Sequence, residues 1–467
     1  MRRRKSSTTS FAEGTAIVTE AAGASRRGTT RLLISNVRVF DGLGGPPRAG
    51  YVLIDGRKIS EVGTGDVPRP SSTDTAVIDG GGRVLIPGLS DAHVHIVLAG
   101  STRSELMTGG AGVGYLKGAA EAEAMLMRGF TTVRDMGGDT GDLKRLIDAD
   151  VLPGPRIYPS QAGVSQTAGH GDFGMVYDEP KVLGGSPTRT EELGVMRVAD
   201  GRPQVLAAVR EQLKRGASQI KMMAGGGVAS AYDPLEVLQF TADELRAGVE
   251  AAADWGTYVA VHVYTGPGIR RAVEAGVRVI EHGHLAEEDD IRRMADEGAR
   301  LSTQPFLESD HSYSNPVSAE KNRRVCRGVE STFAWAAEHD VPLAFGTDLL
   351  LDPAKSSKQS EMLTRLARFC GGSSAGLTVA TSGNAELFRL SGARDPYQAP
   401  VPAEGNQETD RPEPPHLNHL GVLAEGAWAD MLLVEGDPTQ DLGVLGDPET
   451  NLAVIIKDGR VHKNTLA

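Results

Sequence analysis

Between residues 89 and 394, short apolar runs alternate with longer amphipathic segments. The apolar runs have the length of buried strands, and the segments between them have helical spacing. A capping box at 241–244 begins one helix, and further helices are expected at 287–297 and within 319–338. Eight strand–helix alternations predict an α/β fold, a (β/α)8 TIM barrel. The expected strands are 89–93, 131–135, 156–160, 219–222, 258–262, 278–282, 300–303 and 343–348.

Alternating apolar and polar residues at both ends of the chain predict a second, smaller domain. One β segment covers 31–88 and the other covers 417–467. Because segments at the two ends of a barrel can pair with each other, we expect a small β-sandwich built from both. Residues 1–30 are rich in Ser, Thr, Ala and Gly and predict a disordered tail. Residues 395–416 predict a Pro-rich extended loop.

Composition and charge narrow the class of protein. A chain of 467 residues with 40% hydrophobic residues can bury a large core, and its net charge of −12 argues against binding nucleic acid. No apolar run is long enough to cross a bilayer, and no signal-peptide core follows the basic residues 2–5. We therefore expect a cytoplasmic protein with no membrane partner, acting on a small molecule. Whether the protein forms a homo-oligomer is left open.

Chemically reactive side chains gather at the ends of the expected strands. His93 and His95 are one residue apart, so on a strand they share a face and can bind one metal ion. The active site of a barrel lies at the carboxyl ends of its strands, so all these side chains are expected to converge. Without a cation they would repel one another or lack partners, and the sequence therefore predicts a metal centre. The other candidates are Lys221, His262, His282 and Asp348.

A lysine among metal ligands needs a chemical reason. Lys221 lies between Ile220 and Met222, and burial among apolar side chains lowers the pKa of a lysine. A neutral amine can react with carbon dioxide to give a carbamate, an anion whose two oxygens can bridge two divalent ions. The expected cofactors are therefore carbon dioxide and two divalent metal ions, with zinc the metal that this ligand set commonly binds.

Together these motifs resemble a known family. The stretches PGLSDAHVH, SQTAGHGD, IKMMAGGG, HVYT, EHGH and FGTD are similar to those of the amidohydrolase superfamily, in its Xaa-Pro dipeptidase-like and ochratoxinase-like branch. The resemblance covers about 32–463. It implies that His170 and Tyr264 lie near the substrate, with His170 in a lid-like loop at 161–201. It also implies two sites, one formed by His93, His95, Lys221 and Asp348, and the other by carboxylated Lys221, His262 and His282.

Departures from related branches narrow the reaction. Thr265 stands where zinc deaminases of the superfamily carry a glutamate, which disfavours deamination. We expect hydrolysis of a carbon–nitrogen bond, in an amide or a peptide-like small molecule, by a metal-activated hydroxide, with Asp348 as the proton carrier. Hydrolysis of a carboxyl ester, lactone or phosphotriester stays open, as does a metal-binding protein without catalysis. The histidines without a strand-end position are expected in solvent: His311, His339, His416, His419 and His462.

Overall fold

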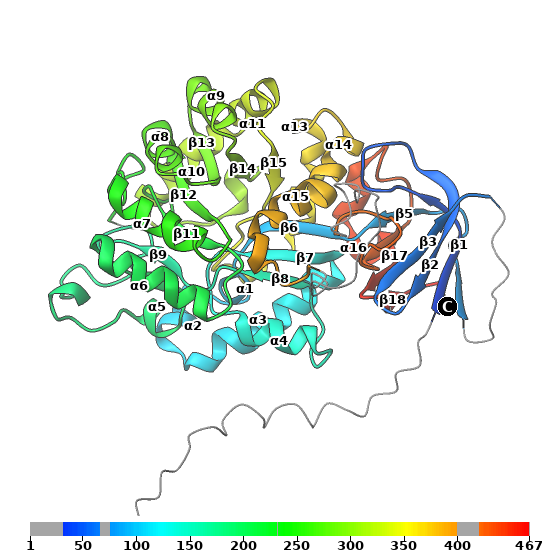
Figure 1. Cartoon of the computed structure of the whole chain (residues 1–467), viewed down its shortest axis with the longest axis horizontal. Helices are drawn as coiled ribbons and strands as arrows, with labels where there is room; N and C mark the ends of the chain where they lie inside the picture. Colours follow the sequence, from blue (N-terminus) through cyan, green and yellow to red (C-terminus); the bar gives the residue numbers. More distant parts are fainter. Residues whose placement is uncertain (1–30, 66–74, 231, 399–419, 467) are drawn as a thin grey trace, which may run out of the picture.

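The structure, a computed structural model, describes residues 31–65, 75–230, 232–398 and 420–466. One part of the described chain alternates strands and helices, and the other is built mainly from strands (Figure 1). The expected tail, and the Pro-rich loop from residue 399 onward, lie outside the described residues. No helix in the described part is long and apolar enough to span a bilayer.

Parallel strands form two sheets in the α/β part, ordered β6-β7-β8 and β10-β9-β11-β12-β13-β14-β15. All eight expected strands are present within a few residues, but β15 ends at Phe345, before Asp348. The short strands β9 and β10 were not expected; Gln161, at a left-handed φ of 59°, separates β8 from β9. The bounds are β6 Leu89–Val94, β7 Phe130–Asp135, β8 Arg156–Pro159, β9 Gly163–Ser165, β10 Met196–Val198, β11 Ile220–Met223, β12 Val259–Thr265, β13 Val279–Leu285, β14 Arg300–Thr303 and β15 Leu343–Phe345.

Helices follow most of these strands. The capping box is confirmed: the Thr241 hydroxyl accepts from the Glu244 backbone N–H (3.4 Å) at the start of α7. The helix expected within 319–338 is two helices that meet at Gly328, where a Cβ would lie 1.6 Å from the His284 carbonyl oxygen. The bounds are α1 Ile96–Ala99, α2 Arg103–Thr108, α3 Ala111–Met127, α4 Gly141–Asp148, α5 Arg189–Glu192, α6 Gly201–Lys214, α7 Ala242–Ala253, α8 Gly266–Glu274, α9 Glu288–Asp296, α10 Pro316–Arg327, α11 Val329–Glu338, α12 Lys358–Thr364, α13 Leu366–Phe369, α14 Ser373–Thr378, α15 Asn384–Phe388 and α16 Pro448–Asn451.

The β domain contains strands from both ends of the described chain. Strand β16 pairs antiparallel with β5, and Figure 1 shows the red C-terminal strands beside the blue N-terminal ones. The strands form one continuous sheet, β18-β17-β16-β5-β1-β2-β3 with β4 beside β1, rather than a sandwich of separate sheets. Hydrogen bonds between Ile59 and the backbone of Gly426 and Ala427 curl the β3 edge back toward β16. The bounds are β1 Arg31–Val39, β2 Arg48–Asp55, β3 Lys58–Gly63, β4 Thr75–Asp79, β5 Val84–Pro87, β16 Met431–Val434, β17 Leu452–Lys457 and β18 Arg460–Asn464.

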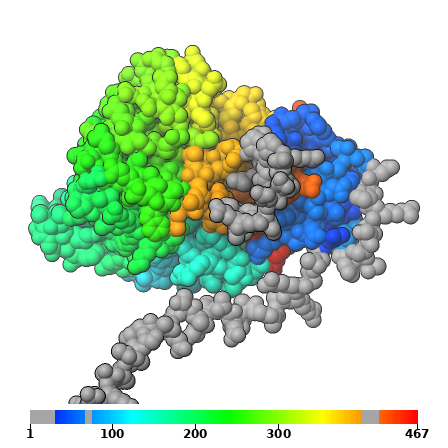
Figure 2. All heavy atoms as spheres, in the orientation of Figure 1, coloured from blue at the N-terminus to red at the C-terminus, as the bar shows by residue number. Residues whose placement is uncertain are grey.

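A buried cation fastens the β domain to the α/β part. Arg156, on β8, donates to both oxygens of Asp430 (3.0 and 3.3 Å) and to Asp458. Its guanidinium lies 3.9 Å from the centre of the Trp428 ring. All three charged side chains are buried, so the junction resists sliding. Figure 2 shows the residues coloured blue, near the N-terminus, at one end of the molecule and those coloured green, from the middle of the chain, at the other.

Candidate active site

Three of the expected ligands converge at the carboxyl end of β6. One carboxylate oxygen of Asp348 lies 3.4 Å from His93 Nε2 and 3.3 Å from His95 Nε2. The backbone N–H of Asp348 donates to the His93 carbonyl (2.8 Å), which places this carboxylate although β15 has already ended. Gly346 permits that approach, since a Cβ there would lie 2.4 Å from His93 Cβ.

The rings of these two histidines are held with their Nε2 atoms toward Asp348. His93 Nδ1 lies 2.8 Å from a Glu281 carboxylate oxygen, and His95 Nδ1 lies 3.1 Å from the Gly137 carbonyl oxygen. In the neutral rings both Nδ1 atoms therefore donate, and both Nε2 atoms keep their lone pairs. Two imidazole lone pairs and a carboxylate oxygen facing one point fit a divalent cation.

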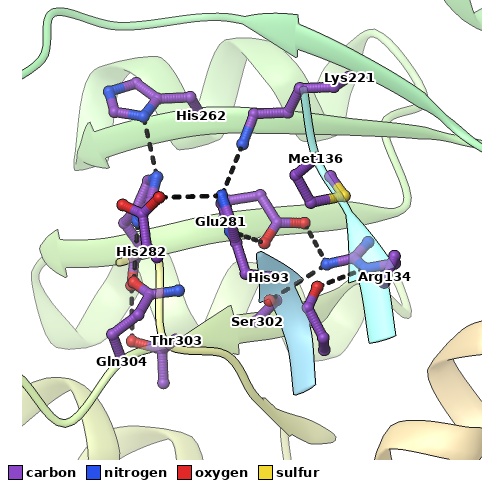
Figure 3. A network of polar contacts seen from close by, with 12 residues as sticks. His93, Arg134, Met136, Lys221, His262, Glu281, His282, Ser302, Thr303 and Gln304 are labelled. Atoms are coloured by element: carbon purple, nitrogen blue, oxygen red, sulfur yellow. Dashed lines mark hydrogen bonds and ion pairs between the residues drawn. The ribbon is translucent and has the colours of Figure 1, made fainter. Parts of the chain in front are cut away.

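A buried ion pair supports His93 from behind (Figure 3). Arg134, on β7, donates to the second Glu281 oxygen at 2.6 Å, and the side chains of Arg134 and Glu281 are fully buried. Arg134 also donates to the Ala92 carbonyl (2.6 Å) and to Ser302 (3.2 Å), so its position is fixed from several strands. Sequence reasoning missed this pair; the available signal was that each charge directly precedes a strand-end residue, Asp135 or His282.

The other two expected histidines face each other. His262 Nδ1 lies 2.8 Å from His282 Nε2. His262 Nε2 donates to the Gly226 carbonyl (3.3 Å), and His282 Nδ1 donates to the Gln304 side-chain oxygen (2.8 Å). The two facing nitrogens thus both carry lone pairs, an arrangement that repels unless a cation lies between or beside them. Burial lowers the pKa of His282 to about 3, which keeps its ring neutral and available as a ligand.

Lys221 points into the space between the two groups. Its ammonium nitrogen lies 3.4 Å from His93 Nε2, and Figure 3 shows the side chain extending from β11 toward His93. Lys221 is 1% exposed, and burial lowers its pKa to about 8. A lysine with this pKa has a reactive neutral form close to neutral pH. All six residues predicted as ligands line the same cavity.

His170 and Tyr264 border the same centre. The His170 ring stacks on His262, with ring centres 4.1 Å apart, and the Tyr264 ring centre is 5.0 Å from those of His262 and His282. His170 Nδ1 lies 2.7 Å from the Ser230 hydroxyl, which directs Nε2 away from that loop. Gly227 allows the approach, because a Cβ there would lie 1.9 Å from the His170 ring.

The backbone against which His170 packs, at Gly227 and Ser230, is itself fixed by a buried lysine. Lys321, on α10, donates to the carbonyl oxygens of Gly227 (2.9 Å), Ser230 (3.1 Å) and Asp233 (2.7 Å). Three such bonds satisfy every ammonium proton. The His170 ring therefore packs against residues that Lys321 holds in place, Gly227 and Ser230.

A cavity of about 960 Å³, counted with its open mouth, contains all eight of these side chains. One correction concerns His311, which was expected in solvent: it lines the cavity, with Nε2 3.3 Å from the Asp348 carbonyl oxygen. It reaches this place from a turn at 308–310 that no strand-end pattern reveals. Apolar side chains form much of the wall, among them Leu98, Leu106, Met107, Phe173, Val195 and Met196.

Comparison with known proteins places the chain in a family. Residues 84–393 match the sequence profile of the amidohydrolase family. The ochratoxinase of Aspergillus niger is 28% identical over 452 residues, which cover 91% of this chain and 85% of that protein. A solved prolidase complexed with N-methylphosphonate-L-proline is 32% identical at a TM-score of 0.80, covering 93% of this chain and all of that one. An Xaa-Pro dipeptidase with bound methionine is 26% identical at a TM-score of 0.75, with 93% and 100% covered.

The fold and the site thus define a class of enzyme, the hydrolases that act on carbon–nitrogen bonds. The chain belongs to the amidohydrolase family, and the resemblance inferred from its motifs is confirmed. Members of this family generally use a divalent metal and act on small molecules, and the solved relatives imply a TIM-barrel fold with a second domain.

Proposed function

We propose that this chain is a metal-dependent amidohydrolase that cleaves an amide or peptide-like bond of a small molecule. The observation that carries the proposal is the set of lone pairs aimed at one place: Nε2 of His93, Nε2 of His95 and a carboxylate oxygen of Asp348. Two neutral imidazoles and a carboxylate whose lone pairs face one point are the donor set that a divalent cation takes in proteins.

The proposal includes two divalent ions, most simply zinc, and carbon dioxide as a modifying group. His93, His95 and Asp348 would hold one ion, His262 and His282 the other, and Lys221 as a carbamate would contribute an oxygen to each. The depressed pKa of Lys221 supports its reaction with carbon dioxide, because only the neutral amine is nucleophilic. When bound, the metal supplies a Lewis acid that activates water and polarises a carbonyl group.

The protein's own residues would divide the remaining work. Asp348 is the carboxylate at the centre, so it can accept the proton of the attacking water and pass it to the departing amine, which leaves poorly unprotonated. His170 and Tyr264 border the same space and would orient the substrate carbonyl. Neither Cys326 nor Cys370 lines the cavity, so neither serves as a nucleophile.

We further propose that the two parallel sheets close into one barrel. At one junction the Asp348 N–H bonds to the His93 carbonyl, joining the segment that follows β15 to β6 (2.8 Å). At the other, the Ser218 N–H bonds to the Pro159 carbonyl, joining β8 to the start of β11 (2.8 Å). Closure would bring the ends of β6, β11, β12 and β13 to one mouth, as the ligand positions require.

A hydrolysis panel tests the function. Protein reconstituted with zinc and bicarbonate is offered N-acyl amino acids, dipeptides, aryl esters, lactones and phosphotriesters, and its metal content is measured in parallel. The proline-derived ligand of the solved prolidase relative favours amides of amino acids among these. We expect amide cleavage and about two ions per chain. Turnover of esters or phosphotriesters alone would move the reaction to another bond, and metal content well below one ion per chain would refute the centre.

A further inference from the structure

The wall of the catalytic cavity carries one cation that the metal centre does not use. Among the described residues that line the cavity, Arg103 and Lys221 are the lysines and arginines, and Lys221 lies in the centre itself. The matching carboxylate is Asp348, which also lies in the centre. Arg103 is therefore the charged group that an incoming molecule meets on the cavity wall.

Arg103 has no competing partner in the part of the chain that the structure describes, where no hydrogen bond or ion pair of its side chain is recorded. The nearest acid in sequence, Glu105, is already committed: it binds Lys117 at 2.5 Å and accepts from the Thr102 backbone at 2.9 Å as the capping box of α2. The Arg103 guanidinium instead lies 5.6 Å from the ring centre of Phe173, which also lines the cavity. An aromatic face attracts a guanidinium without using its hydrogen-bond donors.

We propose that Arg103 binds a free carboxylate of the substrate, and that it selects N-acyl amino acids and dipeptides over amides that lack an anion. The inference rests on the proposed function and adds the residue that determines specificity. Guanidinium and carboxylate match as two parallel hydrogen bonds. Arg103 is exposed to solvent, so an incoming carboxylate can reach its guanidinium, and Leu106 and Met107 on the same helix also line the cavity.

Kinetics with a matched pair of substrates test the assignment. The best N-acyl amino acid of the panel is compared with its carboxamide, which differs only in lacking the negative charge. For Arg103→Met we expect kcat/KM on the acid to fall about 10- to 100-fold, the size of a lost charged hydrogen bond, with little change on the carboxamide. Arg103→Lys keeps the charge without the paired donors, so its kcat/KM on the acid is expected to lie between those of Arg103→Met and the wild type. Arg292→Met is the control, since Arg292 is 54% exposed and pairs with Asp289 on α9.

A binding measurement separates this inference from the proposed reaction. Calorimetry with an uncleavable N-benzyl amino acid and its carboxamide, on zinc-loaded and metal-free protein, does not require turnover. Tighter binding of the acid that is lost in Arg103→Met supports the site even if no amide is hydrolysed. Equal affinity of acid and carboxamide in the wild type, or an acid preference that survives in Arg103→Met, would overturn it; the latter would place the carboxylate on the metal instead.

Discussion

The substitution Glu281→Gln tests how far metal binding depends on the support behind His93. The carboxylate of Glu281 meets two donors, His93 Nδ1 at 2.8 Å and the Arg134 guanidinium at 2.6 Å, and is fully buried. A glutamine of the same shape offers one acceptor and one donor, so one of the two contacts must become donor against donor. Either His93 shifts its proton to Nε2, the atom that faces Asp348, or Arg134 keeps a buried charge without its carboxylate.

The size of each effect follows from that geometry. A lost partner that fixes the tautomer of a ligand histidine typically weakens metal binding about 10- to 100-fold. Breaking a buried ion pair by removing one charge costs about 3–5 kcal/mol, and we expect the lower end because glutamine keeps the volume and one hydrogen bond. The amide oxygen of the glutamine can face either His93 or Arg134. If it faces Arg134, metal affinity falls; if it faces His93, stability falls; a mixture of the two orientations divides the loss between both quantities.

Competition with a chromogenic chelator measures the metal affinity, and urea unfolding of the metal-free protein measures the stability. Glu274→Gln is the matched control, because Glu274 is 54% exposed, pairs with Arg293, and its loss should leave both quantities within about 0.5 kcal/mol. If Glu281→Gln matched the wild type in both metal affinity and stability, the buried pair would have no role in holding His93, and the reasoning would fail.

Three further substitutions address other parts of the molecule. Lys221→Ala should remove most activity and part of the bound metal, with partial rescue by short carboxylic acids; near-normal turnover would exclude the carbamate. Asp348→Asn should keep the fold and lower kcat on the order of 10²-fold, as measured by steady-state kinetics; ordinary kcat across the pH range would exclude Asp348 as the proton carrier. Arg156→Met should destabilise the protein by about 3–5 kcal/mol in urea unfolding near neutral pH, by leaving buried Asp430 and Asp458 without that cation. The pKa of Asp458 is depressed to about 2 despite its burial, chiefly by Arg156, so its share of the stability is present above its unfolded pKa and is lost as pH falls toward 2. The difference between Arg156→Met and the wild type should therefore shrink on acidification, and a constant difference would contradict this account.

The strand pattern was enough to predict the α/β part of the fold, because buried parallel strands are short apolar runs that end abruptly in polar residues. His93, His262 and His282 stand at or near such ends, and the rule that strand ends share one mouth sufficed to place them together. Asp348 was predicted with them although it lies past β15, because residues 343–348 look like a single strand in the sequence, whereas β15 ends at Phe345.

Residues outside this pattern could not be found in the same way. Glu281 and Arg134 meet only because β13 and β7, which belong to different sheets, bring their side chains together in space, which residue spacing does not reveal. His311 and Arg103 reach the cavity from a turn and from a short helix, where no periodicity relates them to the centre. The strands β9 and β10, with three residues each, are too brief to show an alternation.

The pairing of β5 with β16 has a consequence for how the centre is assembled. Strand β5 ends at Pro87, and β6, which leads directly to His93, begins at Leu89. The residue between them, Gly88, donates its N–H to the Asp430 carbonyl at 2.9 Å. The strand that brings the first candidate ligand histidines is thus fastened by residues more than 300 positions later in the chain. Contacts of such long range form late and slowly, so a growing chain reaches its complete ligand geometry only once the C-terminal strands are in place.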